Sequence, residues 1–187
     1  KKLQINECGK LVVCKNDTDF KGLDELEKRA KYNNVELHKI SEKEAKKIEP
    51  RVITNRVALW SPTTFSINPI QVMESLLSDA LGLGIKVVTD TRYLHSNRNN
   101  KIIVTSKGNY NYSYFINSAG LYADKIAIEW GFSKKYRILP FKGLYLNANP
   151  LAYKPKVHIY PVPDLKFPFL GVHFTLTVDG LAKIGPT

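Results

Sequence analysis

The stretch IKVVTDTRYLHSNRNNKIIVTSKGNYNYSYFI at residues 85–116 decides the fold class. It holds four short strand-like runs, at 85–88, 92–94, 102–105 and 110–116, with turn signals at 97–100 and 107–109. Consecutive strands joined by short turns pair in an antiparallel manner, whereas a doubly wound parallel sheet needs a helix between its strands. This stretch therefore predicts antiparallel strands rather than a βαβ fold.

Helices flank this stretch on both sides along the chain. Apolar side chains that recur every three to four residues predict helices over 17–34, 69–81 and 121–130. A capping box from Ser41 to Glu44 starts a fourth, short helix that Pro50 ends. The helix at 69–81 is expected to bury its apolar residues, Ile70, Met73, Leu76, Leu77 and Ala80.

Further strands are expected near both ends of the chain. Apolar or alternating stretches predict strands at 11–14, 35–40, 57–60, 137–146, 157–160, 169–175 and 181–184, and a polar loop at 61–68. Helices and strands mix without regular alternation, and no internal repeat occurs. The sequence thus predicts the α+β class, with a mixed or antiparallel sheet and flanking helices.

The composition is that of a globular protein. Of the 187 residues, 43% are hydrophobic, 11% aromatic and 24% charged, which excludes disordered, collagen-like and coiled-coil chains. The densest apolar stretch, at 167–174, is far shorter than the roughly 20 residues that cross a bilayer. The chain begins with Lys1 and ends inside an expected strand, so we expect a piece of a longer protein.

The charge is strongly basic. Lys and Arg number 28 against 17 Asp and Glu, giving a net charge of +11, which favours an anionic ligand. The longest basic cluster is Lys134, Lys135 and Arg137, and the sequence has neither a basic helical stripe nor an aromatic ribonucleoprotein motif. We therefore expect no nucleic-acid partner, although a basic anion-binding module remains an alternative.

Cysteine and histidine spacing indicates neither a redox pair nor a metal site. Cys8 and Cys14 flank an apolar run six residues apart, which fits neither a CxxC motif nor a zinc knuckle. The four histidines lack the spacing of metal ligands, so no metal is expected. Reduced core cysteines are typical of a cytoplasmic protein, so we expect a cytoplasmic location, with attachment at the periphery of a membrane as an alternative.

Common nucleotide-binding and hydrolase motifs are absent. Gly82-Leu83-Gly84 follows a predicted helix rather than a strand and lacks a third Gly at Val87, so it is not a dinucleotide fingerprint. No Gly-x-Ser-x-Gly elbow and no Walker loop occurs. These absences exclude the usual hydrolase and nucleotide-triphosphatase classes.

Four stretches carry the functional signal. YFINSAGLYAD at 114–124 leads from a strand through small residues into a helix, a geometry in which backbone N–H groups can meet a phosphate. IYPVPD at 159–164 and FPFLGVHFT at 167–175 are dense in Pro, Gly and aromatic residues, which is typical of a shaped site. CGKLVV at 8–13 and LPFKGLY at 139–145 complete the pattern.

With these stretches in this order, the chain resembles FAD-dependent oxidoreductases of the D-amino-acid-oxidase type, and within them the L-2-hydroxyglutarate dehydrogenase/oxidase branch. The resemblance runs from about residue 8 to the C-terminus. It implies FAD-dependent oxidation of a small 2-hydroxy acid, L-2-hydroxyglutarate to 2-oxoglutarate, by hydride transfer to the flavin. The implied partners are an anionic small-molecule substrate and an electron acceptor, either oxygen or a quinone.

The resemblance also implies a domain organisation. Residues 1–187 would form the central portion of a flavoprotein, with 10–60 and 136–187 mainly in its substrate domain and 69–131 mainly in its FAD-binding domain. The sequence departs from the family in lacking the Gly-x-Gly-x-x-Gly fingerprint, and in having no basic residue at Leu176 or Thr177. Lys142 stands where the family usually has Arg. A lysine ammonium contacts a carboxylate at one point, whereas an arginine guanidinium can form two parallel hydrogen bonds with it.

The resemblance assigns roles to particular residues. His173 is the candidate catalytic base, the alternative being a structural histidine bonded to a backbone carbonyl. The candidate substrate-binding residues are Lys142, Tyr145, Tyr160, Thr64 and Ser66. The alternative roles are surface solvation for the lysine, core packing for the tyrosines and plain turn positions for Thr64 and Ser66.

On the cofactor side, the small-residue turn of Ser118, Ala119 and Gly120 would let backbone approach FAD, and Arg92 lies in a strand that could face the adenine.

Two other functions stay open besides oxidation of a 2-hydroxy acid. One is a related glycerol-3-phosphate or amino-acid oxidase, and the other is a non-catalytic fragment that binds no flavin by itself.

Overall fold

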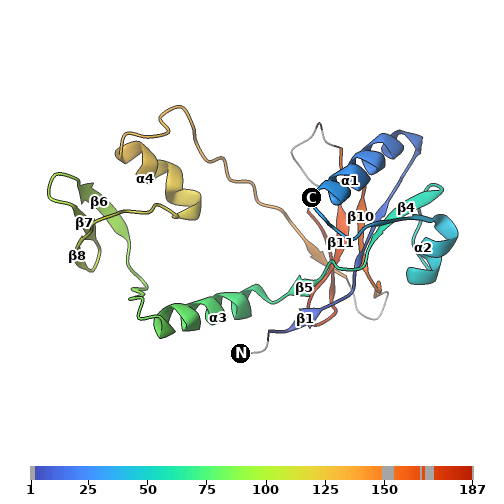
Figure 1. Ribbon diagram of the computed structural model, residues 1–187, viewed down its shortest axis with the longest axis horizontal. Helices are drawn as coiled ribbons and strands as arrows, with labels where there is room; N and C mark the ends of the chain where they lie inside the picture. Colours follow the sequence, from blue (N-terminus) through green and yellow to red (C-terminus); the bar gives the residue numbers. More distant parts are fainter. Residues whose placement is uncertain (1–2, 149–153, 165, 167–170, 187) are drawn as a thin grey trace. The chain divides into compact units, whose positions relative to one another are not determined.

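The computed structural model describes residues 3–148, 154–164, 166 and 171–186 (Figure 1). The chain folds as two compact units. The first combines Lys1–Ser78 with Gly143–Thr187, and the second comprises Asp79–Lys142. The first unit is therefore built from two separate segments of the chain.

The first unit contains a seven-stranded sheet with strand order β3-β4-β2-β10-β11-β12-β9. Five of its pairs are antiparallel, while β2 and β10 are parallel and join the early segment of the chain to the late one. The strands are β2 (Lys10–Val13), β3 (His38–Ser41), β4 (Val57–Ser61), β9 (Leu146–Asn147), β10 (His158–Pro161), β11 (His173–Leu176) and β12 (Ala182–Gly185).

Alternating apolar residues of β2 build a core on each face of this sheet. Leu11 and Val13 pack with Ala45 of helix α2 (Glu42–Ile48). Val12 and Cys14 pack with Leu23 of helix α1 (Phe20–Tyr32), which follows a short 3-10 helix, η1 (Asp17–Asp19). The period of two along the strand and of 3.6 along the helix explains this arrangement.

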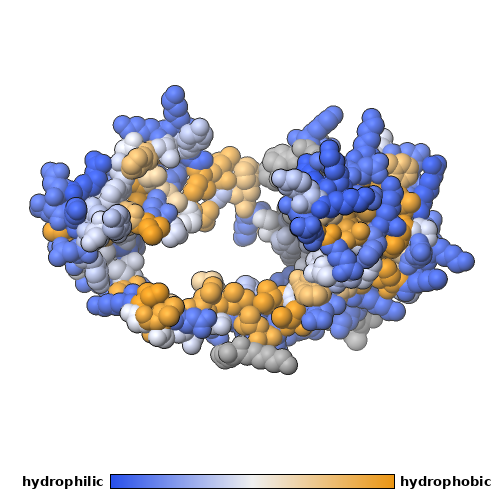
Figure 2. Space-filling model, in the orientation of Figure 1, coloured by the Kyte–Doolittle hydropathy of each residue, from blue (hydrophilic) through white to orange (hydrophobic). Residues whose placement is uncertain are grey.

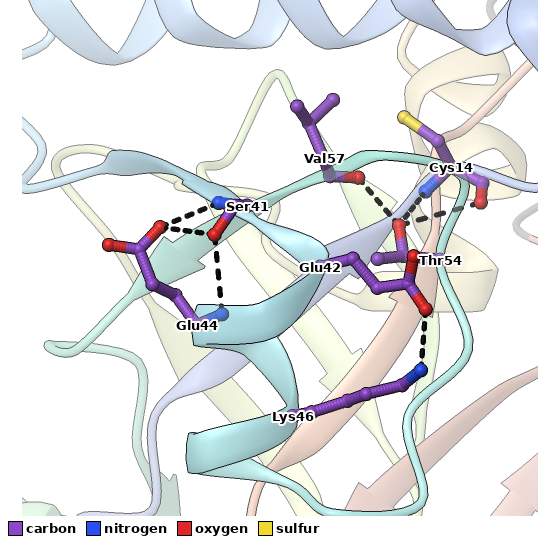
Figure 3. Close-up of polar contacts among 7 residues, drawn as sticks. All are labelled: Cys14, Ser41, Glu42, Glu44, Lys46, Thr54 and Val57. Atoms are coloured by element: carbon purple, nitrogen blue, oxygen red, sulfur yellow. Dashed lines mark hydrogen bonds and ion pairs between the residues drawn. The ribbon is translucent and has the colours of Figure 1, made fainter.

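Polar contacts fix the junction of β2, α2 and β4 (Figure 3). The predicted capping box is present, because the Ser41 side chain accepts from the Glu44 N–H and the Glu44 carboxylate accepts from the Ser41 N–H at 2.8 Å. The buried Thr54 hydroxyl accepts from the Cys14 N–H at 3.0 Å and donates to the Val57 carbonyl at 2.5 Å. These bonds satisfy backbone groups where the strands end.

A small antiparallel sheet precedes the long helix of the chain. It pairs β1 (Ile5–Asn6) with β5 (Ser66–Ile67), which lies inside the segment expected to be a loop. Asn68 caps helix α3 (Pro69–Gly82), since its side-chain oxygen accepts from the Ile70 N–H at 3.0 Å. Two paired residues in each strand are too few to produce a readable alternation, so the sequence did not predict them.

The helix predicted at 69–81 is confirmed as α3, but its expected burial is wrong. Ile70, Met73, Leu76 and Leu77 are 68%, 64%, 56% and 41% exposed, and none of the α3 residues is buried. Hydrophobic side chains lie along this helix in Figure 2. Helical spacing predicts an apolar face but not what covers it.

The second unit contains a three-stranded antiparallel sheet and a short helix. Its strands are β6 (Tyr93–Asn97), β7 (Ile102–Thr105) and β8 (Gly108–Asn111), followed by a 3-10 helix, η2 (Gly120–Tyr122), and helix α4 (Ala123–Glu129). Phe115 stacks on Trp130 at 4.7 Å between ring centroids. The Glu129 carboxylate accepts from the Tyr93 hydroxyl at 2.9 Å and holds α4 against β6.

The α+β class predicted from the sequence is confirmed. Several strand bounds were wrong: 85–88 and 112–116 form no strand, and the strand expected at 137–146 is reduced to β9. Ile85 is 53% exposed, so apolar composition there does not reflect a buried strand. Of the strand expected at 169–175, residues 169–170 lie outside the described residues, and β11 begins at His173.

Both cysteines are free, and burial raises the pKa of each thiol. Cys14 lies in the core as expected, whereas Cys8 precedes β2 and is only partly buried. In the part of the chain that the structure describes, no helix combines the length and apolar character that a membrane span requires.

Candidate active site

One face of the seven-stranded sheet carries a row of polar and aromatic side chains beside the α1 core. The parallel pairing sets His158 opposite Lys10, and the antiparallel pairing sets Ile159 opposite Phe174. The next pair in that register is Tyr160 with His173. Because paired residues share a face and neighbours along a strand alternate, all four polar side chains lie on the face of Val12.

The centre of this face is a stack of Tyr160 on His173. The two ring centroids are 4.0 Å apart and the ring planes differ by 21°. The ring of Tyr145 approaches the imidazole edge-on at 6.2 Å, and the Tyr160 hydroxyl lies 3.3 Å from the Thr175 hydroxyl. Three residues predicted from the sequence, His173, Tyr160 and Tyr145, are thus brought together.

The hydrogen bond of His173 determines which nitrogen holds its lone pair. Nδ1 lies 2.8 Å from the carbonyl oxygen of Gly171. A carbonyl can only accept, so Nδ1 carries the proton and, in the neutral ring, Nε2 carries the lone pair. Within the described ranges no hydrogen bond occupies Nε2. A buried imidazole oriented in this way can accept a proton at Nε2.

The second buried histidine, His158, belongs to a closed cycle of hydrogen bonds. The Leu176 N–H donates to Nδ1 at 3.0 Å, so the proton of the neutral ring is on Nε2, which lies 3.3 Å from the Ser66 hydroxyl. That hydroxyl donates to the Leu176 carbonyl. Burial, and then the charges of Lys10 and His173, lower the pKa of His158 and favour this neutral form.

This cycle distinguishes the two histidines. Both nitrogens of His158 and the hydroxyl of Ser66 are used within the fold, so Ser66 fits a structural role better than contact with substrate. Thr64 also has a local role: its hydroxyl lies 3.0 Å from that of Ser61, and its carbonyl accepts from the Gly9 N–H at 2.9 Å. Lys142 is exposed at the end of the second unit.

Sequence reasoning missed two members of this face, His158 and Lys10. The Nζ atom of the half-buried Lys10 lies 5.4 Å from the ring centroid of Tyr160, and burial lowers the pKa of this lysine. A signal was available, because His158 and Tyr160 are two residues apart in a predicted strand and must share a face.

The predicted cofactor-side residues lie in the second unit. Gly120 has a φ of +54°, and a Cβ placed there would meet nothing within 4 Å, so its backbone is open to approach. The Asn117 side chain holds this turn by accepting from the Ala119 N–H at 3.3 Å and donating to the Ala123 carbonyl at 2.8 Å. An open turn of small residues fits a cofactor that approaches backbone closely.

Arg92 and Ala119 line one cavity of about 770 Å³ together with Tyr122, Lys125 and Glu129. The two cations make this cavity suitable for an anionic group such as a phosphate. Ser118 and Gly120 adjoin Ala119 in the chain but are not among the lining residues. Among the described residues, no group of three or more His, Cys, Asp or Glu side chains could hold a metal ion.

Comparison with known proteins agrees with these features. The chain matches the FAD dependent oxidoreductase (DAO) family over residues 1–187. It is 34% identical to the mitochondrial L-2-hydroxyglutarate dehydrogenase of Mus musculus and 28% identical to the L-2-hydroxyglutarate dehydrogenase of Escherichia coli K12. These alignments cover 100% and 98% of the chain but only 43% and 44% of the relatives.

Among solved structures, the L-proline dehydrogenase of P. horikoshii superposes with a TM-score of 0.80 at 22% identity, over 99% of this chain and 51% of that one. At this identity the likeness concerns the fold alone. The mouse relative is described as mitochondrial and the bacterial one is not, so a cytoplasmic location stays a prediction.

Proposed function

The chain belongs to the FAD-dependent oxidoreductase family, and from this premise we propose that its protein uses FAD to oxidise a small 2-hydroxy acid, with L-2-hydroxyglutarate as substrate and 2-oxoglutarate as product. One observation carries the proposal: a buried imidazole, His173, is oriented with its lone pair on Nε2 beside Tyr160. Since the chain spans less than half the length of the mouse and E. coli relatives, the activity is proposed for the whole protein.

His173 acts in this proposal as the general base. Oxidation of a secondary alcohol removes a hydride from carbon and a proton from oxygen, and the proton needs an acceptor within hydrogen-bond reach. Nε2 of His173 takes that proton, while the Nδ1 bond to Gly171 and the stack on Tyr160 hold the ring in position. FAD, when bound, accepts the hydride.

Tyr145 and the Tyr160 hydroxyl are proposed to contact the substrate from either side of the imidazole. Lys142 is proposed to contact a substrate carboxylate as a point charge. On the cofactor side, Arg92 and the turn of Ser118, Ala119 and Gly120 would hold part of FAD. The open backbone at Gly120 and the cationic cavity support this assignment.

Anaerobic reduction of bound FAD tests the proposal. Mixing the FAD-loaded protein with L-2-hydroxyglutarate should bleach the visible flavin band, while the D-enantiomer should leave it unchanged. Bleaching by glycerol 3-phosphate or an amino acid, with none by L-2-hydroxyglutarate, would instead support the related-oxidase alternative. Loss of FAD during gel filtration would support a fragment that binds no flavin. Reoxidation with oxygen or a quinone then identifies the electron acceptor.

A further inference from the structure

Lys10 is a half-buried cation at the edge of the candidate active site. Among the described residues no carboxylate forms an ion pair with it. The Nζ atom instead lies 5.4 Å from the centroid of the Tyr160 ring. An aromatic face attracts a cation but is a poor hydrogen-bond acceptor. The three N–H groups of the ammonium can therefore still donate to an anionic ligand.

The backbone that presents Lys10 is held from both sides. The Gly9 N–H donates to the Thr64 carbonyl at 2.9 Å, and the Gly9 carbonyl accepts from the His158 N–H at 3.1 Å. Gly9 has a φ of +70°, and a Cβ there would lie 2.1 Å from an indole carbon of Trp60. The position of Lys10 is therefore determined by its immediate neighbours rather than by a flexible loop.

Tyr160 lies between the lysine and the catalytic candidate. It is on β10, with Lys10 on the neighbouring β2 and His173 on the neighbouring β11. The Nζ atom is 5.4 Å from the tyrosine centroid, and the imidazole centroid is 4.0 Å from it. The Tyr160 ring thus separates the ammonium group of Lys10 from the imidazole of His173. A ligand that bonds His173 at one end can reach the ammonium group with its other end.

This spacing fits a five-carbon dicarboxylate. With C–C bonds of about 1.5 Å, the hydroxyl-bearing carbon of an extended 2-hydroxyglutarate is about 4 Å from its distal carboxyl carbon. The C–O bond at each end brings the two outer oxygens to about 6 Å apart, and a hydrogen bond of about 2.8 Å beyond each oxygen extends the reach to at most about 12 Å. A molecule of this length can bond Nε2 of His173 with its hydroxyl and Nζ of Lys10 with its distal carboxylate.

We propose that Lys10 binds the distal carboxylate of the substrate and so selects dicarboxylic over monocarboxylic 2-hydroxy acids. The inference rests on the proposed function, because it places the hydroxyl of that substrate at His173. Lys10 takes no part in bond breaking, and its role is specificity. The matched ligand is 2-hydroxyvalerate, which has the same five carbons and hydroxyl but a methyl group in place of the distal carboxylate.

The test measures binding separately from turnover. In the FAD-loaded protein, the dissociation constants of 2-oxoglutarate and of 2-oxovalerate are measured by titration calorimetry. Lys10→Met should weaken 2-oxoglutarate binding by about 10- to 100-fold and 2-oxovalerate binding by less than about 2-fold. Lys10→Arg should retain most of the affinity, and Lys43→Met, which removes an exposed charge on α2, should change neither constant.

An equal loss for both ligands, or no loss for either, would overturn the proposal. If the Lys10→Met protein fails to fold, a second measurement uses the unmodified protein. In it, 2-oxoglutarate should slow acetylation of the Lys10 amine, whereas 2-oxovalerate should not. Equal labelling rates with both ligands would also overturn it.

The two proposals fail in different ways. If 2-oxoglutarate binding depends on Lys10 but L-2-hydroxyglutarate does not reduce the flavin, the proposed function fails and the Lys10 assignment stands. If the flavin is reduced and Lys10→Met binds 2-oxoglutarate as the unmodified protein does, the Lys10 assignment fails and the function stands. Absence of 2-oxoglutarate binding in the unmodified protein overturns the Lys10 assignment.

Discussion

The ring of Tyr160 lies nearly parallel to the imidazole of His173, at 4.0 Å between centroids and 21° between planes. The two residues belong to adjacent antiparallel strands and share one face of the sheet. Because the imidazole is also anchored through Nδ1 to the Gly171 carbonyl, the ring has one preferred plane and one preferred direction for its lone pair. The stack therefore orients the candidate base.

Removing the stack should slow flavin reduction more than removing the tyrosine hydroxyl. Tyr160→Phe keeps the ring and loses the hydroxyl, with its contact to Thr175 and its proposed contact to the substrate, so we expect a change of about 3-fold. Tyr160→Leu removes an aromatic contact worth about 0.5–1.5 kcal/mol, and we expect a rate about 10-fold lower. Anaerobic stopped-flow absorbance measures both rates, and equal rates for the two variants would exclude an orienting role.

Replacing the base should affect chemistry rather than folding. In His173→Asn, the side-chain amide can still donate to the Gly171 carbonyl, but no nitrogen is left to accept the substrate proton. General base catalysis typically contributes 10²- to 10⁴-fold, so flavin reduction should slow by about that factor. The thermal midpoint should change little. A variant that reduces flavin at the unmodified rate would contradict the assignment of His173.

Local patterns in the sequence predicted most of the elements of the fold. The continuous apolar run at 11–14 predicted a strand, and apolar residues at helical spacing predicted a helix over 17–34, in which Leu23 and Ala30 prove to be buried. Each of these signals is contained within a few residues, so no knowledge of partners is needed.

The missed features depend on partners far apart in the chain. The parallel pairing of β2 with β10 creates the polar face, and nothing in either strand alone specifies it. Lys10 lies in the CGKLVV stretch, but the stretch alone indicates no role for it, because only the register of β2 with β10 brings the lysine beside Tyr160. The exposure of α3 was missed for the same reason. The spacing of its apolar residues predicted an apolar face, but whether that face is buried depends on other parts of the fold.

Stability should decrease as the pH falls below the ordinary histidine value because of His158. Burial, with Lys10 and His173, holds the pKa of this imidazole below its usual value of 6.5. The unfolded chain takes up the proton near pH 6.5, whereas the folded chain stays neutral until lower pH. The stability from neutral His158 is therefore complete above pH 6.5 and is lost as the pH falls through the folded pKa.

Thermal midpoints between pH 7.5 and 5.5 measure this dependence. His158→Asn keeps an acceptor for the Leu176 N–H and has no titratable group, so its midpoint should fall less steeply with decreasing pH than that of the unmodified protein. His95→Asn removes an exposed imidazole and serves as the control, with an unchanged slope expected. Identical slopes for His158→Asn and the unmodified protein would show that His158 does not set the acid response.

Gly9 should tolerate no side chain, since its backbone conformation and its contact with Trp60 both require glycine. A φ of +70° is costly for an alanine, and its Cβ would lie 2.1 Å from an indole carbon, which forces the ring or the strand to shift. Overpacking of this kind costs about 1–3 kcal/mol, so Gly9→Ala should lower the free energy of unfolding by at least that much.

Urea titrations of variants at two other glycines distinguish backbone strain from overpacking as the cause of the lower free energy of unfolding. Gly84 has a φ of +77° but open space around it, so Gly84→Ala reports the cost of backbone strain without overpacking. Gly82 ends α3 with nothing within 4 Å of a Cβ, and Gly82→Ala should be neutral or slightly stabilising. If Gly9→Ala loses no more free energy of unfolding than Gly84→Ala, the indole contact does not constrain the chain before Lys10. The backbone before that lysine is then held by the bonds of Gly9 to Thr64 and His158 alone.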